Sequence, residues 1–98
     1  MLEVSILLDY YRNLLSDRQK EYLLEHFEED LSLTEIGKKY NVSRQAVYDN
    51  IRRGIKILRD YEEKIGFHKR DLELLSQLKE LKKDFTIKKL DEIIEKNF

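Results

Sequence analysis

Proline is absent from this 98-residue chain, and glycine occurs only three times, at Gly37, Gly54 and Gly66. A chain of this length with average composition would carry about five prolines and seven glycines. These two residues interrupt helices and form tight turns, so their scarcity predicts few breaks in regular structure. Leu, Lys, Glu, Arg and Ile, which suit helix interiors, dominate the rest of the chain. We therefore predict an all-α fold.

The first two helical segments are expected near residues 3–15 and from Ser16 to the acidic run at 28–30. In the first, Leu7, Tyr11, Leu14 and Leu15 recur at helical spacing. The second starts with Ser16-Asp17-Arg18-Gln19. This pattern is a capping box, in which the serine hydroxyl accepts from a backbone N–H and the glutamine side chain reaches back.

A short helix over 33–40 and a longer one over 44–65 should follow. Ser32 and Glu35 form a second capping box. Asn41 tolerates the left-handed conformation that a tight turn needs, Ser43 caps the longer helix, and Gly66 is the residue that ends it. The predicted inward-facing residues are Leu33, Ile36 and Tyr40 on the short helix, and Val47, Ile51, Gly54/Ile55, Leu58 and Ile65 on the long one.

After Gly66 the chain has the pattern of two further amphipathic helices. The first carries a stripe that covers only about two heptads, which is too short to assign a coiled coil. We expect residues 67–98 to complete the core of a helix-turn-helix bundle formed by residues 1–66, or to form a homodimer. The apolar positions are Leu72, Leu75, Leu78, Leu81 and Phe85 on the first helix, and Ile87, Leu90, Ile93 and Ile94 on the second, which Thr86 caps.

Charge is distributed unevenly, although the formal net charge of the whole chain is −1. Residues 1–31 hold three basic and eight acidic side chains, and residues 60–98 hold nine basic and ten acidic ones. Residues 32–59 hold seven basic and two acidic side chains, which is a local net charge of +5. This basic centre points to a polyanionic partner that the overall charge would not reveal.

The basic centre also has the layout of a helix-turn-helix: a short capped helix, a turn and a longer capped helix. The two helices of this motif cross closely, and Gly37 supplies the small residue that the crossing needs. Val42 is expected to plug the turn, while Val47 and Ile51 dock the second helix. The other side of the second helix must then be polar and cationic to enter a DNA major groove.

Helical spacing places Arg44, Gln45, Tyr48, Asp49, Arg52 and Lys56 on that other side. Arg can bind guanine and Gln can bind adenine through paired hydrogen bonds. Tyr48 could stack on a base or equally cover the seam where the helix docks on the core. Asp49 repels phosphate, but it could accept a hydrogen bond from cytosine or form an ion pair with a neighbouring arginine. Basic residues such as Arg59 suit phosphates, which position DNA without specifying its sequence. The predicted nucleic-acid contacts are Lys38, Lys39, Arg44, Gln45, Tyr48, Asp49, Arg52, Arg53 and Lys56.

The stretch from Leu15 to Arg59, which contains SLTEIGKKYNVSRQAVYDNIRR, resembles region 4 of bacterial sigma factors, a promoter-reading helix-turn-helix. Together with LLDYYRNLL and DYEEK it is similar to the YlxM family of small bacterial helix-turn-helix-like proteins. The resemblance implies an all-helical DNA-binding protein that reads DNA with the helix from Ser43 to Arg59. Genes of YlxM-like proteins are commonly adjacent to those of the signal recognition particle, which implies a regulatory or accessory role in that pathway.

Two positions depart from the usual motif: Gly37 replaces the common Ala, and Asn41 replaces the common Gly. Both are expected to be sterically tolerable. The chain also leaves no room for the polymerase-binding, strand-opening region of a complete sigma factor, so we do not expect a stand-alone sigma factor.

We predict neither an enzyme nor a metal or cofactor site. The chain has no cysteine, and His26 and His68 lack neighbours at metal-ligand spacing. The serines and the threonine that cap helices have no base beside them, and the glycines are too far apart for a phosphate loop. The longest apolar run is Ile6-Leu7-Leu8, against roughly 18 residues for a membrane span, and the N-terminus lacks the basic region of a signal peptide. We therefore expect a cytoplasmic protein without a membrane partner.

The favoured function is that of a regulator that binds double-stranded DNA. We expect it to act as a homodimer, because two copies would match the two half-sites of a palindromic operator. The alternative is a protein-interaction module that binds a signal recognition particle component without reading DNA. RNA ranks below both, because the A-form major groove is too deep and narrow for such a helix.

Overall fold

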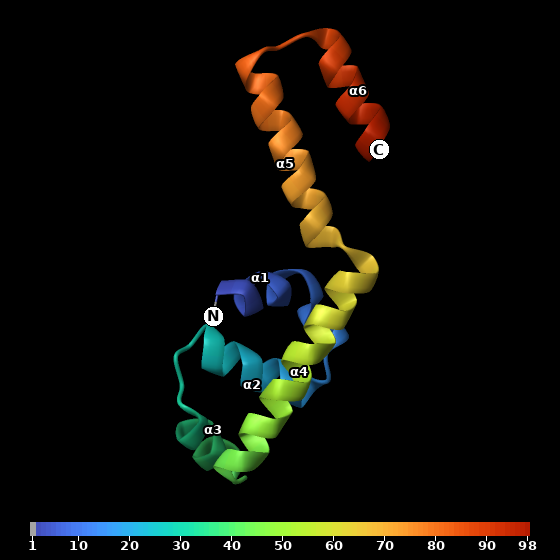
Figure 1. Ribbon diagram of the computed structural model, residues 1–98. Helices are drawn as coiled ribbons and strands as arrows, with labels where there is room; N and C mark the ends of the chain where they lie inside the picture. Colours follow the sequence, from blue (N-terminus) through green and yellow to red (C-terminus); the bar gives the residue numbers. More distant parts are fainter. Residues whose placement is uncertain (1) are drawn as a thin grey trace. The chain divides into compact units, whose positions relative to one another are not determined.

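The computed structural model describes residues 2–98 and contains only helices and their connections in that range, which confirms the predicted all-α fold. The chain divides into two compact units, Met1–Ile65 and Gly66–Phe98 (Figure 1). The helices are α1 (Leu2–Tyr11), the 3₁₀ turn η1 (Arg12–Leu14), α2 (Asp17–Phe27), α3 (Leu33–Tyr40), α4 (Arg44–Ile65), α5 (Phe67–Lys83) and α6 (Ile87–Asn97).

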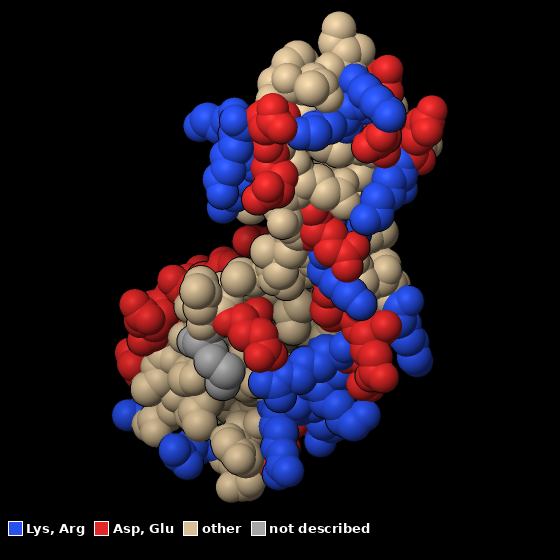
Figure 2. All heavy atoms as spheres, turned by 45° about the horizontal axis from the view of Figure 1, so that its top comes forward, with Lys and Arg blue, Asp and Glu red and all other residues tan. Residues whose placement is uncertain are grey.

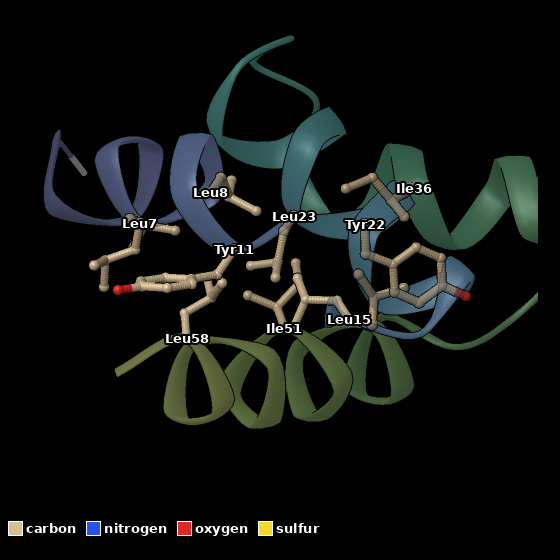
Figure 3. Packing of buried hydrophobic residues seen from close by; sticks show 11 residues of the cluster. Leu7, Leu8, Tyr11, Leu15, Tyr22, Leu23, Ile36, Ile51 and Leu58 are labelled. Carbon is tan, nitrogen blue, oxygen red and sulfur yellow. The ribbon is translucent and has the colours of Figure 1, made fainter. Parts of the chain in front are cut away.

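The first unit is built around α4, which packs against α1, α2 and α3. Its buried positions, Val47, Ile51, Gly54 and Leu58, are three or four residues apart and therefore share one side of the helix. Figure 3 shows this side meeting leucines, isoleucine and tyrosines from the other three helices. The buried cluster consists of Val4, Leu7, Leu8, Tyr11, Leu15, Tyr22, Leu23, Ile36, Val47, Ile51 and Leu58.

Local hydrogen bonds begin α2, α3 and α4 where the sequence predicts. Ser16 Oγ accepts from Gln19 N at 3.2 Å. At α3 the capping box is complete, because Ser32 Oγ accepts from Glu35 N and Glu35 Oε1 accepts from Ser32 N, both at 3.0 Å. α4 runs unbroken to Ile65, and Gly66 follows with a left-handed φ of 72°. These bonds depend on near neighbours in the chain, so the sequence predicts them well.

Two predicted core positions in this unit are wrong. The first helix ends at Tyr11 rather than near residue 15, because the chain turns through η1 and continues extended at Leu15. That turn buries Leu15 and leaves Leu14 50% exposed. Ile65 is 44% exposed, since it lies on the last turn of α4, beyond the buried stripe that ends at Leu58.

The second unit is a helical hairpin in which α5 and α6 pack side by side in antiparallel orientation (Figure 1). Thr86 Oγ1 caps α6 by accepting from Lys89 N at 3.1 Å, and Asn97 Nδ2 donates to Gln77 Oε1 at 2.8 Å across the hairpin. Of the stripe predicted on α5, the hairpin buries Leu81, whereas Leu72, Leu75 and Leu78 remain exposed. Phe85 lies in the connection between the helices and is also exposed.

No helix in the described range 2–98 combines the length and the apolar character that crossing a bilayer would require.

Candidate nucleic-acid interface

The turn between α3 and α4 is held by backbone hydrogen bonds. Asn41 has a left-handed φ of 56°, and its N–H points to the carbonyls of Gly37 and Lys38. Val42 N donates to Gly37 O at 2.9 Å. Ser43 Oγ then accepts from Ala46 N at 3.0 Å, which caps the start of α4. The two helices are thus joined by a compact, left-handed turn, as the sequence predicts for a helix-turn-helix.

Gly37 and Val42 play roles somewhat different from those expected. A Cβ atom on Gly37 would lie 2.7 Å from Val42 O, so a small residue is required by the backbone of the turn itself. Even the methyl group of the usual alanine would demand a shift of that turn, so glycine at this position is sterically tolerated, as expected, and alanine would not fit the turn as it stands. Val42 does not plug the turn: the side chain is 39% exposed, because the backbone hydrogen bond to Gly37 already closes it.

The side of α4 away from the core carries the predicted contacts. Arg44, Gln45, Arg52, Arg53 and Lys56 are exposed there, Tyr48 is 43% exposed, and Asp49 is half-buried. Figure 2 shows Lys and Arg atoms gathered over the surface of the α4 region. One helix therefore has an apolar side docked on the core and a cationic side turned to solvent.

The arginines of this surface are available for a ligand. Within the described residues 2–98, the guanidinium groups of Arg44, Arg52 and Arg53 make no hydrogen bond or ion pair. Lys56 Nζ pairs with Asp60 Oδ2 at 3.1 Å, although the Lys56 side chain is 78% exposed. Gln45 Nε2 donates to Asp49 Oδ1 at 2.9 Å, so Asp49 holds the glutamine rather than an arginine.

The same surface is hollowed. An open depression of about 600 Å³ is lined by Arg52, Arg53, Ile55, Lys56, Arg59, Asp49 and Asp60. Arg59 Nε donates to Glu3 Oε1 at 2.7 Å, and this hydrogen bond raises the pKa of the Arg59 guanidinium. Cations that line a concave surface attract anions more strongly than the same charges on a flat one.

Lys38 and Lys39 lie at the end of α3 and differ in their surroundings. Lys38 is exposed. Lys39 pairs with the carboxylate of Glu25 on α2, and this hydrogen bond raises the pKa of Lys39. Tyr40 Oη donates to the same Glu25 Oε1 at 3.0 Å; burial, and then this hydrogen bond, raises the pKa of Tyr40. Lys39 therefore already has a protein partner.

Glu25 is the structural residue that sequence reasoning missed. It is 6% exposed, and its Oε2 atom is buried without a hydrogen-bond partner among residues 2–98. The signal was present, because Arg18, Tyr22 and Glu25 recur at helical spacing on α2 and so place a carboxylate on the face of a buried tyrosine. Arg18 completes the cluster, with its guanidinium carbon 4.4 Å from the centre of the Tyr40 ring.

A second, more apolar hollow of about 280 Å³ lies between α2, α3 and α4. Tyr48 and Arg52 line it on the α4 side. Tyr48 thus borders both solvent and the docking seam, and the structure leaves both predicted roles available. The other lining residues are His26, Phe27, Leu33, Ile51 and Ile55.

A capped short helix, a left-handed turn closed on a glycine and a long helix with one docked and one cationic side define a helix-turn-helix protein. The chain belongs to the UPF0122 family: the family model described as "Putative helix-turn-helix protein, YlxM / p13 like" matches residues 1–97. This match confirms the resemblance to the YlxM family.

Relatives from several bacteria align with this chain over three quarters or more of their own length. A UPF0122 protein of Fusobacterium nucleatum is 53% identical over 94 residues, which are 96% of this chain and 91% of that protein. A UPF0122 protein of Halalkalibacterium halodurans is 46% identical over 83 residues, covering 81% of this chain and 75% of that protein. A UPF0122 protein of Lactococcus lactis is 40% identical over 95 residues, covering 92% and 86%.

Proposed function

We propose that this protein is a regulator that binds double-stranded DNA, with α4 in the major groove. Arg44, Gln45, Tyr48, Asp49 and Arg52 would face the base edges. Lys38, Lys39, Arg53, Lys56 and Arg59 would contact phosphates. This division follows the chemistry of the two surfaces of DNA, since base edges carry the sequence information and phosphates fix the position of the protein.

The observation that carries the proposal is the state of three arginines on α4. Arg44, Arg52 and Arg53 are exposed, and none of them bonds to another group in residues 2–98. An arginine that already has a carboxylate partner must give it up before it can bind a phosphate or a guanine. These three have no such partner, so their five N–H donors each are available without that cost.

Lys39 illustrates the contrasting case. A phosphate contact by Lys39 would take its ammonium group away from Glu25, whose carboxylate is buried. The gain of one contact would then be offset by the loss of another. We therefore expect Lys39 to contribute less to DNA affinity than the neighbouring Lys38.

The salt dependence of binding tests the proposal. For B-DNA, log affinity falls with log salt with a slope of about −0.9 per phosphate neutralised. The variant with Arg44→Ala, Arg52→Ala and Arg53→Ala should lose retention on DNA, and the slope should flatten by about one unit, because Arg53 is the one residue of the three assigned to a phosphate. A matched control removes three exposed cations elsewhere, Lys64→Ala, Lys88→Ala and Lys96→Ala, and should bind as the wild type does.

Fluorescence anisotropy with duplex DNA between low and physiological salt measures both the affinity for DNA and its salt dependence. DNA ligands that the wild type selects from a random pool serve as the probe. Equal retention by the triple-arginine variant and the wild type would refute the assignment of the reading side of α4.

A second candidate is a protein-interaction module on the same scaffold. The apolar hollow beside Tyr48 favours it, because apolar pockets with a few polar groups at the rim suit side chains of a protein partner. Drawing on the family resemblance, we propose a component of the signal recognition particle as that partner, and an accessory role in its pathway for the protein. Co-elution with the purified particle, little affected by salt and by loss of the three arginines, would favour this candidate over DNA.

We also propose that the protein works as a homodimer. Two copies would present two α4 helices, and paired reading helices match the two half-sites of a palindromic operator.

A further inference from the structure

The α5–α6 hairpin has apolar side chains that its own packing does not cover. Leu72, Leu75 and Leu78 on α5 are 53%, 46% and 43% exposed. On α6, Ile94 is 47% exposed, and Phe98 directly after the helix is 91% exposed. Monomeric proteins seldom leave so many large apolar side chains together in water, so such surfaces commonly mark interfaces.

Four of these side chains, Leu75, Leu78, Ile94 and Phe98, lie on one side of the hairpin, whereas Leu72 points about half a turn away from Leu81 and lies outside it. With 3.6 residues per turn, Leu75 and Leu78 point about a third of a turn or less away from Leu81, which packs on α6. Ile94 and Phe98 point about a quarter of a turn away from Ile93 and Asn97, in the same rotational sense. Because the two helices are antiparallel, rotation in the same sense brings both strips to the same side of the hairpin. We refer to this side as the open face.

The open face has borders of opposite charge. On α5, Lys79 lies beyond the strip and Lys82 continues the strip toward the end of the helix; on α6, Asp91 and Glu95 lie beyond the strip. All four side chains are exposed, and none of them makes an ion pair within the described residues. A surface that is apolar in the middle, basic along one helix and acidic along the other is complementary to a copy of itself.

We propose that the open face binds the open face of a second copy of this chain, with α5 of each copy lying on α6 of the other. A two-fold axis parallel to the helices produces this arrangement. Leu75 and Leu78 then pack on Ile94 and Phe98 of the second copy, since the Gln77–Asn97 hydrogen bond sets these residues at similar heights along the hairpin. Both α5 helices, which directly follow Gly66, begin at the same end of the resulting four-helix bundle.

Charge selects this arrangement over the other two-fold packing. If α5 lay on α5 of the second copy, Lys79 and Lys82 would face identical lysines, and Asp91 and Glu95 would face identical carboxylates. Like charges in contact destabilise an interface, whereas α5 on α6 pairs each lysine border with a carboxylate border. Reversing the charges on only one of the two helices therefore distinguishes the two packings.

Sedimentation equilibrium of the full chain across a range of concentrations tests the interface. The wild type should be a dimer, and Leu75→Asp should be a monomer with unchanged helix content by circular dichroism. Leu14→Asp is the matched control, because Leu14 is 50% exposed and lies outside the hairpin; this variant should still dimerise. If the wild type is monomeric at all concentrations, the proposal is overturned. That result would mean that the open face is covered within the chain or needs no cover.

Charge-reversal variants test the packing. Lys79→Glu with Lys82→Glu, or Asp91→Lys with Glu95→Lys, should each raise the dimer dissociation constant at least about tenfold. The variant with all four changes should dimerise as the wild type does, and an equimolar mixture of the two double variants should form a heterodimer. If each double variant dimerises as tightly as the wild type, α5 does not lie on α6 of the second copy, and the proposed arrangement is refuted.

Discussion

Replacement of Glu25 by alanine should loosen the first helix of the helix-turn-helix. The Glu25 carboxylate lies on α2 and accepts hydrogen bonds from Lys39 and Tyr40, which both belong to the last turn of α3. The Tyr40 ring packs edge-on against Tyr22, with ring centres 5.1 Å apart. One buried acceptor thus ties the end of α3 to α2, just before the turn that leads into α4.

The magnitude follows from the exposure of each partner. A hydrogen bond to a charged group contributes about 1.5–3 kcal/mol, and the Tyr40 hydroxyl would lose this partner while half-buried. The Lys39 side chain is 53% exposed, so solvent screening limits its ion pair to about 0–1 kcal/mol. The buried, unpaired Oε2 atom of Glu25 already costs some stability in the wild type, and its removal offsets part of the loss. We expect Glu25→Ala to lower the free energy of unfolding by about 2 kcal/mol. Glu25→Gln, which keeps an acceptor oxygen, should lower it by about 1 kcal/mol.

Urea unfolding followed by tyrosine fluorescence measures this loss in the right part of the chain. The chain has six tyrosines, all between residues 10 and 61, and no tryptophan. The signal therefore reports the unit Met1–Ile65 without interference from the hairpin. Tyr40→Phe removes the same hydrogen bond from the other side, so its effect and that of Glu25→Ala should not add in the double variant. A loss below about 0.5 kcal/mol for Glu25→Ala, or fully additive losses, would refute the reasoning.

Three further predictions concern the α3–α4 segment. Gly37→Val should lower the free energy of unfolding by about 3 kcal/mol in the same urea experiment, because its Cβ would lie 2.7 Å from a backbone oxygen of the turn. Asn41→Gly should leave stability unchanged or improve it slightly, whereas Asn41→Ala should cost about 1 kcal/mol, since φ is 56° there; equal thermal midpoints for the two variants would contradict this. The hydrogen bond from Ser32 N holds the pKa of Glu35 below its ordinary 4.5, so its contribution to stability is present above pH 4.5 and is lost as the pH falls through the lower, folded-state value. Glu35→Gln should therefore flatten the acid side of the stability–pH profile, and an unchanged slope would show that the capping box does not contribute.

The boundaries of α3 and α4 could be predicted because they depend on residues close together in the chain, whereas the early end of α1 at Tyr11 could not. Ser32 and Glu35 cap α3 through mutual hydrogen bonds three residues apart, and Gly66 ends α4 with a backbone conformation that glycine adopts without strain. The docked and solvent-facing sides of α4 also follow from sequence, because helical geometry alone assigns Val47 and Ile51 to one side and Arg44 and Arg52 to the other. These local rules predicted the all-α fold, the helix-turn-helix and its cationic surface.

Tertiary structure decided which of these side chains are covered and which charges are already paired. Lys38 and Lys39 are neighbours with the same chemistry, yet only Lys39 meets the buried carboxylate of Glu25, because α2 brings that group beside the end of α3. Leu81 and Leu75 belong to one predicted stripe, yet α6 covers the first and leaves the second in solvent. Burial and pairing depend on which distant segments come together in space, and the residue pattern of a single helix carries no information about that.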